Sequence, residues 1–109
     1  MTKKTEPKEK TDPIDLFVPR QIKISIGIEA AKHETTSSEL IRAILNARLD
    51  TAAQSINLPA IDSDLVRMQI RIGRDSKKKI EYLSDKFDIP NHQIMRATII
   101  NFLKEAGAV

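Results

Sequence analysis

Two arginines and a glutamine occupy alternate positions in the segment Arg67–Ile72, with aliphatic residues between them. Alternate side chains of a β-strand point to the same face, so Arg67, Gln69 and Arg71 would share one face of a strand. Arginine can donate two hydrogen bonds to guanine, and glutamine can pair with adenine, in the major groove of DNA. The set is therefore suited to reading bases; the competing interpretation is a charged strand face that deters aggregation.

This segment belongs to an internal repeat. Residues 13–50 align without a gap with residues 67–104, an offset of 54 positions (67 − 13 = 54). Apolar positions coincide along the alignment, and three polar pairs are identical: Arg20 with Arg74, Lys32 with Lys86, and Arg42 with Arg96. A period in this range usually marks a supersecondary unit that cannot bury its apolar face alone. Two copies therefore predict half-domains that share one core.

The first copy carries different side chains at the positions that would read bases. Asp15 and Phe17 align with Gln69 and Arg71. Asp15 could accept a hydrogen bond from cytosine, and Phe17 could contact the methyl group of thymine. It is equally consistent with the sequence that Phe17 fills a gap in the core and that Asp15 caps an element or is solvated.

The first copy is predicted to fold as strand, helix, turn and helix. Ile14–Val18 alternates and ends at Pro19, which indicates a short strand. The next segment, Gln21–Ile28, also alternates and locally resembles a strand, but the gapless alignment predicts a helix there. Thr36-Ser37-Ser38-Glu39 then supplies a cap and a first-turn acid for a second helix that extends to about Gln54.

The second copy repeats this order of elements. Met68–Ile72 is the predicted strand, and Asp75 or Ser76 is the predicted cap of the helix that follows. Ile89-Pro90 breaks that helix, and Asn91 is the predicted cap of a last helix running to about Lys104. The expected fold class is mainly α with a short antiparallel β-ribbon.

The flanking segments differ in composition from the two copies. Residues 1–12 contain no apolar residue after Met1 and are predicted to form a disordered arm. The units are expected at 13–54 and 66–105, joined by a linker at 55–65. A basic stretch opposed only by Asp75 favours a polyanion as partner, although a solvated charged face fits it equally well: Arg67, Arg71, Arg74, Lys77, Lys78 and Lys79.

Composition argues against several classes of protein. The 109 residues include no cysteine, so neither a disulfide framework nor thiolate chemistry is expected. His33 and His92 are the only histidines and have no motif partner; with no glycine-rich phosphate loop either, we expect no enzyme, metal or cofactor. The absence of a long apolar run predicts a cytoplasmic protein rather than a membrane protein.

Four short motifs resemble the ribbon-helix-helix DNA-binding superfamily, which includes the Arc and MetJ repressors. They are Val18-Pro19-Arg20, Ser37–Ile44, Ile72-Gly73-Arg74-Asp75 and Ile94-Met95-Arg96-Ala97. The resemblance covers most of residues 13–104, in two copies. Tandem units in one chain resemble, within that superfamily, the TraY-type accessory proteins of plasmid conjugation.

The resemblance implies a partner, double-stranded DNA, and a way of binding it. Two units would pair their strands into a ribbon that enters the major groove, so that one chain acts as a monomeric pseudo-dimer. The start of each second helix would contact phosphates, with nearby basic side chains adding attraction. The phosphate-contacting residues implied are Ser37, Ser38, Asn91, His92, Arg74, Lys77 and Lys78.

The functional class implied is a transcriptional repressor or an accessory factor at a plasmid transfer origin, where a relaxase or another conjugation protein would be a further partner. Assembly of several chains on longer DNA stays open. One alternative is a protein-interaction module such as an antitoxin, although the chain stops at Val109, soon after Lys104. Another is a helix-turn-helix DNA binder, formed by Lys79–Leu103 with Asn91 opening the recognition helix.

Overall fold

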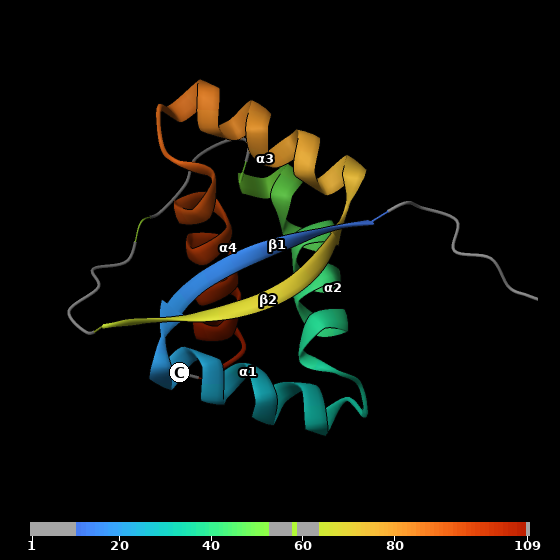
Figure 1. Cartoon of the computed structure of the whole chain (residues 1–109). Coiled ribbons are helices and arrows are strands. Elements are labelled where there is room, and N and C mark those ends of the chain that lie inside the picture. The colour runs from blue at the N-terminus through green and yellow to red at the C-terminus, as the bar shows by residue number, and fades with distance from the viewer. Residues whose placement is uncertain (1–10, 53–57, 59–63, 109) are drawn as a thin grey trace, which may run out of the picture.

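The chain passes twice through strand, helix and helix. We describe residues 11–52, 58 and 64–108 of a computed structural model, in which two strands and four helices are assigned. Figure 1 shows the strands crossing in front of the helices as a two-stranded antiparallel ribbon. The elements are β1 Thr11–Pro19, α1 Arg20–Lys32, α2 Ser37–Ala52, β2 Leu65–Gly73, α3 Arg74–Phe87 and α4 Asn91–Glu105. The predicted fold class, mainly helical with a short antiparallel ribbon, is confirmed.

Equivalent elements begin at the same positions of the two aligned copies. β1 and β2 start 54 residues apart (65 − 11 = 54), as do α1 and α3 (74 − 20 = 54) and α2 and α4 (91 − 37 = 54). The break predicted at Ile89-Pro90 is confirmed as well. There α3 ends at Phe87, Asp88 takes a left-handed conformation with φ of 56°, and α4 begins at Asn91.

Gln21–Ile28 lies inside α1, as the gapless alignment predicts and against its local alternation. In helical geometry residues four apart share a face, so Ile22 and Ile26 are both buried. The two isoleucines between and beyond them point outward: Ile24 is 48% exposed and Ile28 is 54% exposed. The four alternating isoleucines, which would share one face of a strand, are thereby divided between a buried and an exposed face of α1.

The ribbon pairs each strand with its equivalent around a central position. Asp15 lies opposite Gln69, its counterpart in the alignment (69 − 15 = 54), and Pro13 lies opposite Arg71. Exchanging the two strands therefore leaves the register unchanged. Pro13 lacks a backbone donor, which is tolerated where the backbone of an edge strand points away from its partner.

The core lies between the ribbon and the helices. Leu16 and Val18 of β1 and Ile70 and Ile72 of β2 are buried, at positions alternating with outward ones. Helices α2 and α4 pack against each other beneath the ribbon, while α1 and α3 lie along its two opposite long sides (Figure 1). The fully buried residues of α2 and α4 that complete this core are Ile41, Leu45, Leu49, Ile94, Met95, Ile99 and Leu103.

Several predicted boundaries and caps are wrong. Thr11 and Asp12, assigned to the disordered arm, pair with Gly73 and Ile72 in β1, and Leu65, assigned to the linker, opens β2. The rest of the arm, and the linker apart from Leu58 and Asp64, lie outside the described residues. α2 is described as far as Ala52, so its predicted end near Gln54 also falls outside.

The helix caps differ from expectation in two of three cases. Helix α3 is preceded by Gly73 and α4 by Pro90, neither with a side-chain cap, so Asp75, Ser76 and Asn91 lie within the helices instead. Ser76 donates its hydroxyl to Asn46 Oδ1 at 2.7 Å, which gives this buried group a partner in α2. Only the predicted Thr36 cap is present: the Glu39 N–H donates to Thr36 Oγ1 at 3.1 Å.

Among the described residues, no helix has the length and apolar character needed to cross a membrane.

The two faces of α1 give a matched test of the fold. We expect Ile26→Ala to lower the free energy of unfolding by about 2–5 kcal/mol, because it opens a cavity in the core. Ile24→Ala should change it by no more than about 0.5 kcal/mol, because this side chain is exposed. Urea denaturation of both variants measures the difference; equal losses would contradict the helical assignment of this segment.

Candidate nucleic-acid interface

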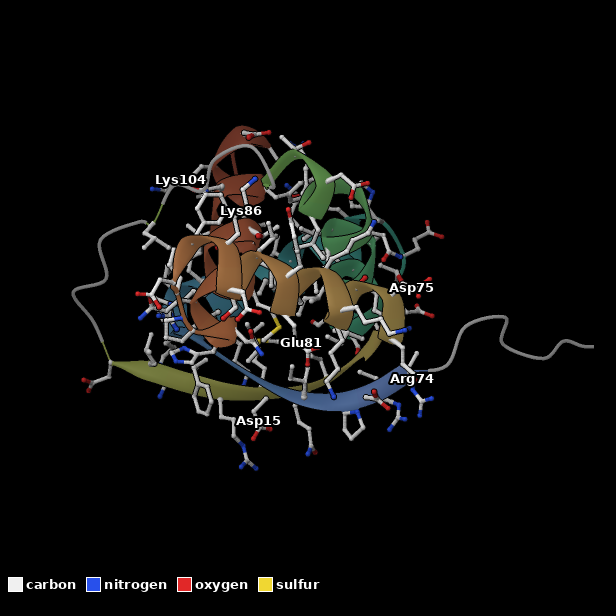
Figure 2. The ribbon with its side chains drawn as sticks, turned by 90° about the horizontal axis from the view of Figure 1, so that it is seen from above. Asp15, Arg74, Asp75, Glu81, Lys86 and Lys104 are labelled. Atoms are coloured by element: carbon white, nitrogen blue, oxygen red, sulfur yellow. The ribbon has the colours of Figure 1, made fainter. Side chains whose placement is uncertain are left out.

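One face of the ribbon is turned away from all four helices. We call it the outer face; it consists of three residues of each strand: Pro13, Asp15, Phe17, Arg67, Gln69 and Arg71. In Figure 2 the two strands are seen edge-on below the helices, and Asp15 lies on the side of the strands that is turned away from the helices. The three residues of β2 are exposed and alternate with Met68, Ile70 and Ile72, which are partly or fully buried. The alternation predicted for Arg67–Ile72 is therefore present.

Arg71 is held in place on the outer face by the neighbouring strand. Its Nε donates to Thr11 Oγ1 at 3.0 Å, and its Nη2 donates to the Thr11 carbonyl at 2.9 Å. A guanidinium has five N–H donors, of which these bonds use two. The remaining donors stay available for an acceptor in front of the ribbon, and the side chain loses less rotamer entropy when it binds one.

Arg67 is held more loosely, by a long ion pair with Asp15 of β1. Its Nη1 lies 3.9 Å from Asp15 Oδ2, and its side chain is 63% exposed. An ion pair this open to solvent contributes little to stability and can be exchanged for another acceptor. Phe17 lies opposite Arg67 in the register, is partly buried, and belongs to the outer face rather than to the buried core formed by the described residues.

The outer edges of both strands are occupied by equivalent arginines. Arg42 of α2 donates through Nη1 to the Arg71 carbonyl at 3.2 Å, and Arg96 of α4 donates through Nη1 to the Phe17 carbonyl at 3.0 Å. Donors and acceptors are both 54 positions apart (96 − 42 = 54; 71 − 17 = 54). Each arginine of one copy thus binds the strand of the other copy, which fixes the ribbon relative to α2 and α4.

Arg96 is the more buried of the pair, at 8% exposure, and burial lowers the pKa of its guanidinium. Arg42 and Arg96 are aligned in the sequence repeat, but no role was predicted for either of them. Their identity at equivalent positions could have indicated these contacts, because a polar group repeated inside an apolar pattern requires a hydrogen-bond partner in each copy.

The starts of α2 and α4, predicted to contact phosphate, differ in their surroundings. Ser37 and Ser38 are partly buried in the first turn of α2, and the Arg71 N–H reaches Ser38 Oγ at a long 3.4 Å. Asn91 and His92, in the first turn of α4, are exposed. The structure thus brings Ser38 next to the base-reading strand and leaves Asn91 and His92 open to solvent.

Glu39 places a negative charge at the start of α2. Thr35 Oγ1 donates to Glu39 Oε1 at 2.6 Å, and this hydrogen bond, followed by one from the backbone of Thr36, lowers the pKa of the Glu39 carboxyl. The position equivalent to Glu39 in α4 is Gln93 (39 + 54 = 93). Because a carboxylate repels phosphate, the start of α4 is the better anion site of the two.

Basic residues at one end of the ribbon share an acid. Arg74 Nε lies 3.4 Å from Asp12 Oδ1, and Lys77 Nζ lies 3.7 Å from Asp12 Oδ2. Lys79 pairs instead with Asp50 of α2 at 3.0 Å, and Lys78 is exposed on α3. Of the predicted basic stretch, Arg74 and Lys77 therefore lie together beside β1 but are partly neutralised.

Nothing among the described residues points to a metal centre, since no group of three or more His, Asp or Glu side chains could hold an ion. Comparisons with protein-family models, with curated proteins and with solved structures gave no match. The interface described above therefore has to be judged on its own geometry.

The hydrogen bond from Thr35 predicts a pH-dependent contribution of Glu39. Because its pKa is lower in the folded than in the unfolded state, ionised Glu39 stabilises the fold above the unfolded-state pKa, and this contribution is lost as the pH falls through the folded-state pKa. We expect Thr35→Val to raise the pKa of Glu39 towards its ordinary value, as measured by NMR titration of the side-chain carboxyl. Thr51→Val, an exposed change at the other end of α2, should leave it unchanged; a pKa of Glu39 that does not respond to Thr35→Val would contradict the assignment.

Proposed function

We propose that this chain is a sequence-specific double-stranded DNA-binding protein that inserts the outer face of its ribbon into the major groove. The observation that carries the proposal is the exposed set Arg67, Gln69 and Arg71 on a two-stranded ribbon whose opposite face is buried. A ribbon of this width fits the major groove, and the three side chains match the donor and acceptor pattern of guanine and adenine.

We also propose that the chain acts as a pseudo-dimer of two ribbon-helix-helix units. Support comes from the register, in which Asp15 faces its own equivalent Gln69, and from the exchanged contacts of Arg42 and Arg96. Contacts of this kind leave each unit incomplete without the other. Fusing the units in one chain makes their pairing independent of protein concentration.

The proposed DNA site is asymmetric. Asp15 and Phe17 stand where Gln69 and Arg71 stand in the other strand, so the two halves of the ribbon offer different groups to the bases. The proposed phosphate-contacting sites differ as well, because Glu39 lies in the first turn of α2 and Gln93 lies at the equivalent position of α4. A site bound by identical subunits would be palindromic, whereas these differences favour a non-palindromic one.

The same proposal covers two biological roles, namely a transcriptional repressor and an accessory factor at a plasmid transfer origin. An asymmetric site favours the second role, since it would orient a relaxase to one side. The helix-turn-helix alternative is disfavoured by burial: all residues from Ile94 to Ile100 of α4 are buried, so this helix offers no continuous face to a groove. A recognition helix needs such a face.

Selection from a random duplex DNA library at physiological salt tests the proposed function. We expect an enriched asymmetric motif, whose genomic position would distinguish a promoter from a transfer origin. A palindromic motif would instead indicate two chains binding together. If no motif is enriched and binding falls steeply as salt rises, the basic residues bind polyanions without sequence preference, and the proposal is wrong.

The role of the outer face is tested by Arg71→Ala. Loss of a bidentate contact to guanine should weaken binding to the selected site by about 1–3 kcal/mol and relax specificity at one base position. Lys104→Ala serves as a charge-matched control, because Figure 2 shows Lys104 far from the ribbon. Fluorescence anisotropy with the selected site and single-base variants measures both effects; an affinity loss that is equal for the two variants would contradict base reading by Arg71.

A further inference from the structure

Leu65 is an exposed apolar side chain that neither the core nor the base-reading set accounts for. It is 40% exposed and stands outside the apolar core formed by the described residues. Because alternate residues of a strand share a face, Leu65 continues the outer face beyond Arg67, in the row that also holds Gln69 and Arg71. The outer face thus has an apolar residue at the end of the ribbon where β2 begins.

The strand register makes Phe17 the diagonal neighbour of Leu65 on this face. Phe17 lies opposite Arg67, and Leu65 lies opposite Pro19, two positions further along. Diagonal neighbours of an antiparallel pair are within reach of aromatic side chains. Phe17 and Leu65, which we call the apolar end of the ribbon, are therefore placed to contact the same small group.

The opposite end of the ribbon shows how closely such a diagonal pair approaches. Arg71 and Thr11, which we call the polar end, are the residues equivalent to Phe17 and Leu65 when the two copies are exchanged (17 + 54 = 71; 11 + 54 = 65). Arg71 Nε and Thr11 Oγ1 are 3.0 Å apart. The same backbone arrangement thus presents a hydrogen-bonding pair at one end and a pair without polar side-chain groups at the other.

The backbone of both ends is held by equivalent contacts. Arg96 Nη1 donates to the Phe17 carbonyl at 3.0 Å, and Arg42 Nη1 donates to the Arg71 carbonyl at 3.2 Å. Phe17 is therefore anchored to α4 through its own main chain, as Arg71 is anchored to α2. Anchoring of this kind reduces the conformational entropy that is lost when a ligand binds.

The side chains of the apolar end restrict what it can recognise. Neither Phe17 nor Leu65 has a side-chain donor or acceptor, so this pair cannot read a base by hydrogen bonds. In the major groove, the apolar group that distinguishes one base from the others is the C5-methyl group of thymine. Arg67, opposite Phe17, is 63% exposed, so an occupant of the apolar end also meets a guanidinium. The edge of a DNA groove offers a methyl group and acceptors together, whereas a purely apolar surface does not.

We propose, on the basis of the proposed function, that Phe17 and Leu65 form an apolar subsite for the methyl group of one thymine, at the opposite end of the DNA site from the guanine that Arg71 binds. Leu65 is thereby a specificity-determining residue outside the alternating set Arg67, Gln69 and Arg71. The asymmetry of the site then takes a chemical form, with a guanine towards one end and a thymine towards the other.

Removal of the methyl group from the DNA is the first test. Fluorescence anisotropy is measured with the selected duplex site and with versions in which one thymine at a time is replaced by uracil. We expect one of these replacements to weaken binding by the wild type about fourfold, the value for one buried methyl group. Leu65→Ala should lower this ratio, and the Phe17→Ala, Leu65→Ala double variant should abolish it. Leu58→Ala, at an exposed leucine outside both strands, is the matched control and should leave the ratio unchanged.

Transfer of the polar end tests the subsite by a change of specificity. Phe17→Arg combined with Leu65→Thr reproduces at this end the side chains of the polar end. Selection with this double variant should enrich guanine where the wild type enriches thymine, and leave the rest of the motif unchanged. Phe17→Leu keeps the end apolar and should still select thymine.

The outcomes distinguish this subsite from the proposed function. A selected motif in which no thymine is sensitive to uracil, or a sensitivity that Leu65→Ala leaves unchanged, would overturn the subsite while the function stands. Continued selection of thymine by the Phe17→Arg, Leu65→Thr variant would overturn it too. Absence of any enriched motif would overturn the function, and the subsite with it.

Discussion

The structure depends on one constraint: a strand-helix-helix unit exposes an apolar strand face that it cannot cover by itself. A two-stranded ribbon is at best marginally stable alone, so β1 and β2 need both each other and the helices beneath them. The pairing of Asp15 with Gln69 satisfies this requirement, because it brings Leu16, Val18, Ile70 and Ile72 to the same side. Once those side chains are buried, the period of two in a strand forces their neighbours outward. The outer face is thus a direct consequence of how the core is closed.

Closing the core in this way creates a second requirement, at the edges of the ribbon. Each strand has one edge without a β partner, and unpaired backbone groups there are costly when water is excluded. Arg42 and Arg96 satisfy one carbonyl on each edge from helices of the opposite copy. A buried guanidinium is itself costly, as the lowered pKa of Arg96 reflects, and its hydrogen bond to Phe17 offsets part of that cost. The same contacts that protect the edges therefore also hold the two copies in register.

The sequence predicted those features that depend on periodicity and on the repeat. The helical assignment of Gln21–Ile28 is the clearest case, since its local pattern favoured a strand and only the comparison with residues 75–82 favoured a helix. The caps of α3 and α4 were not predicted correctly, because the cap positions are occupied by Gly73 and Pro90, which have no side-chain acceptor, and the polar residues that follow lie inside the helices. The contact of Arg71 with Thr11 also escaped prediction, because it joins residues 60 positions apart and depends on the strand register.

The two copies agree in the core and differ at the surface. Gln69 and Arg71 of β2 occupy the positions equivalent to Asp15 and Phe17 of β1, Gln93 is equivalent to Glu39, and Tyr82 is equivalent to Ile28. A symmetric molecule reads a site equally in both orientations. Asymmetry of the ribbon would therefore orient the chain on DNA. The proposed function requires that the two halves of the ribbon differ, which fusion of two units permits because each copy can then vary without altering the other.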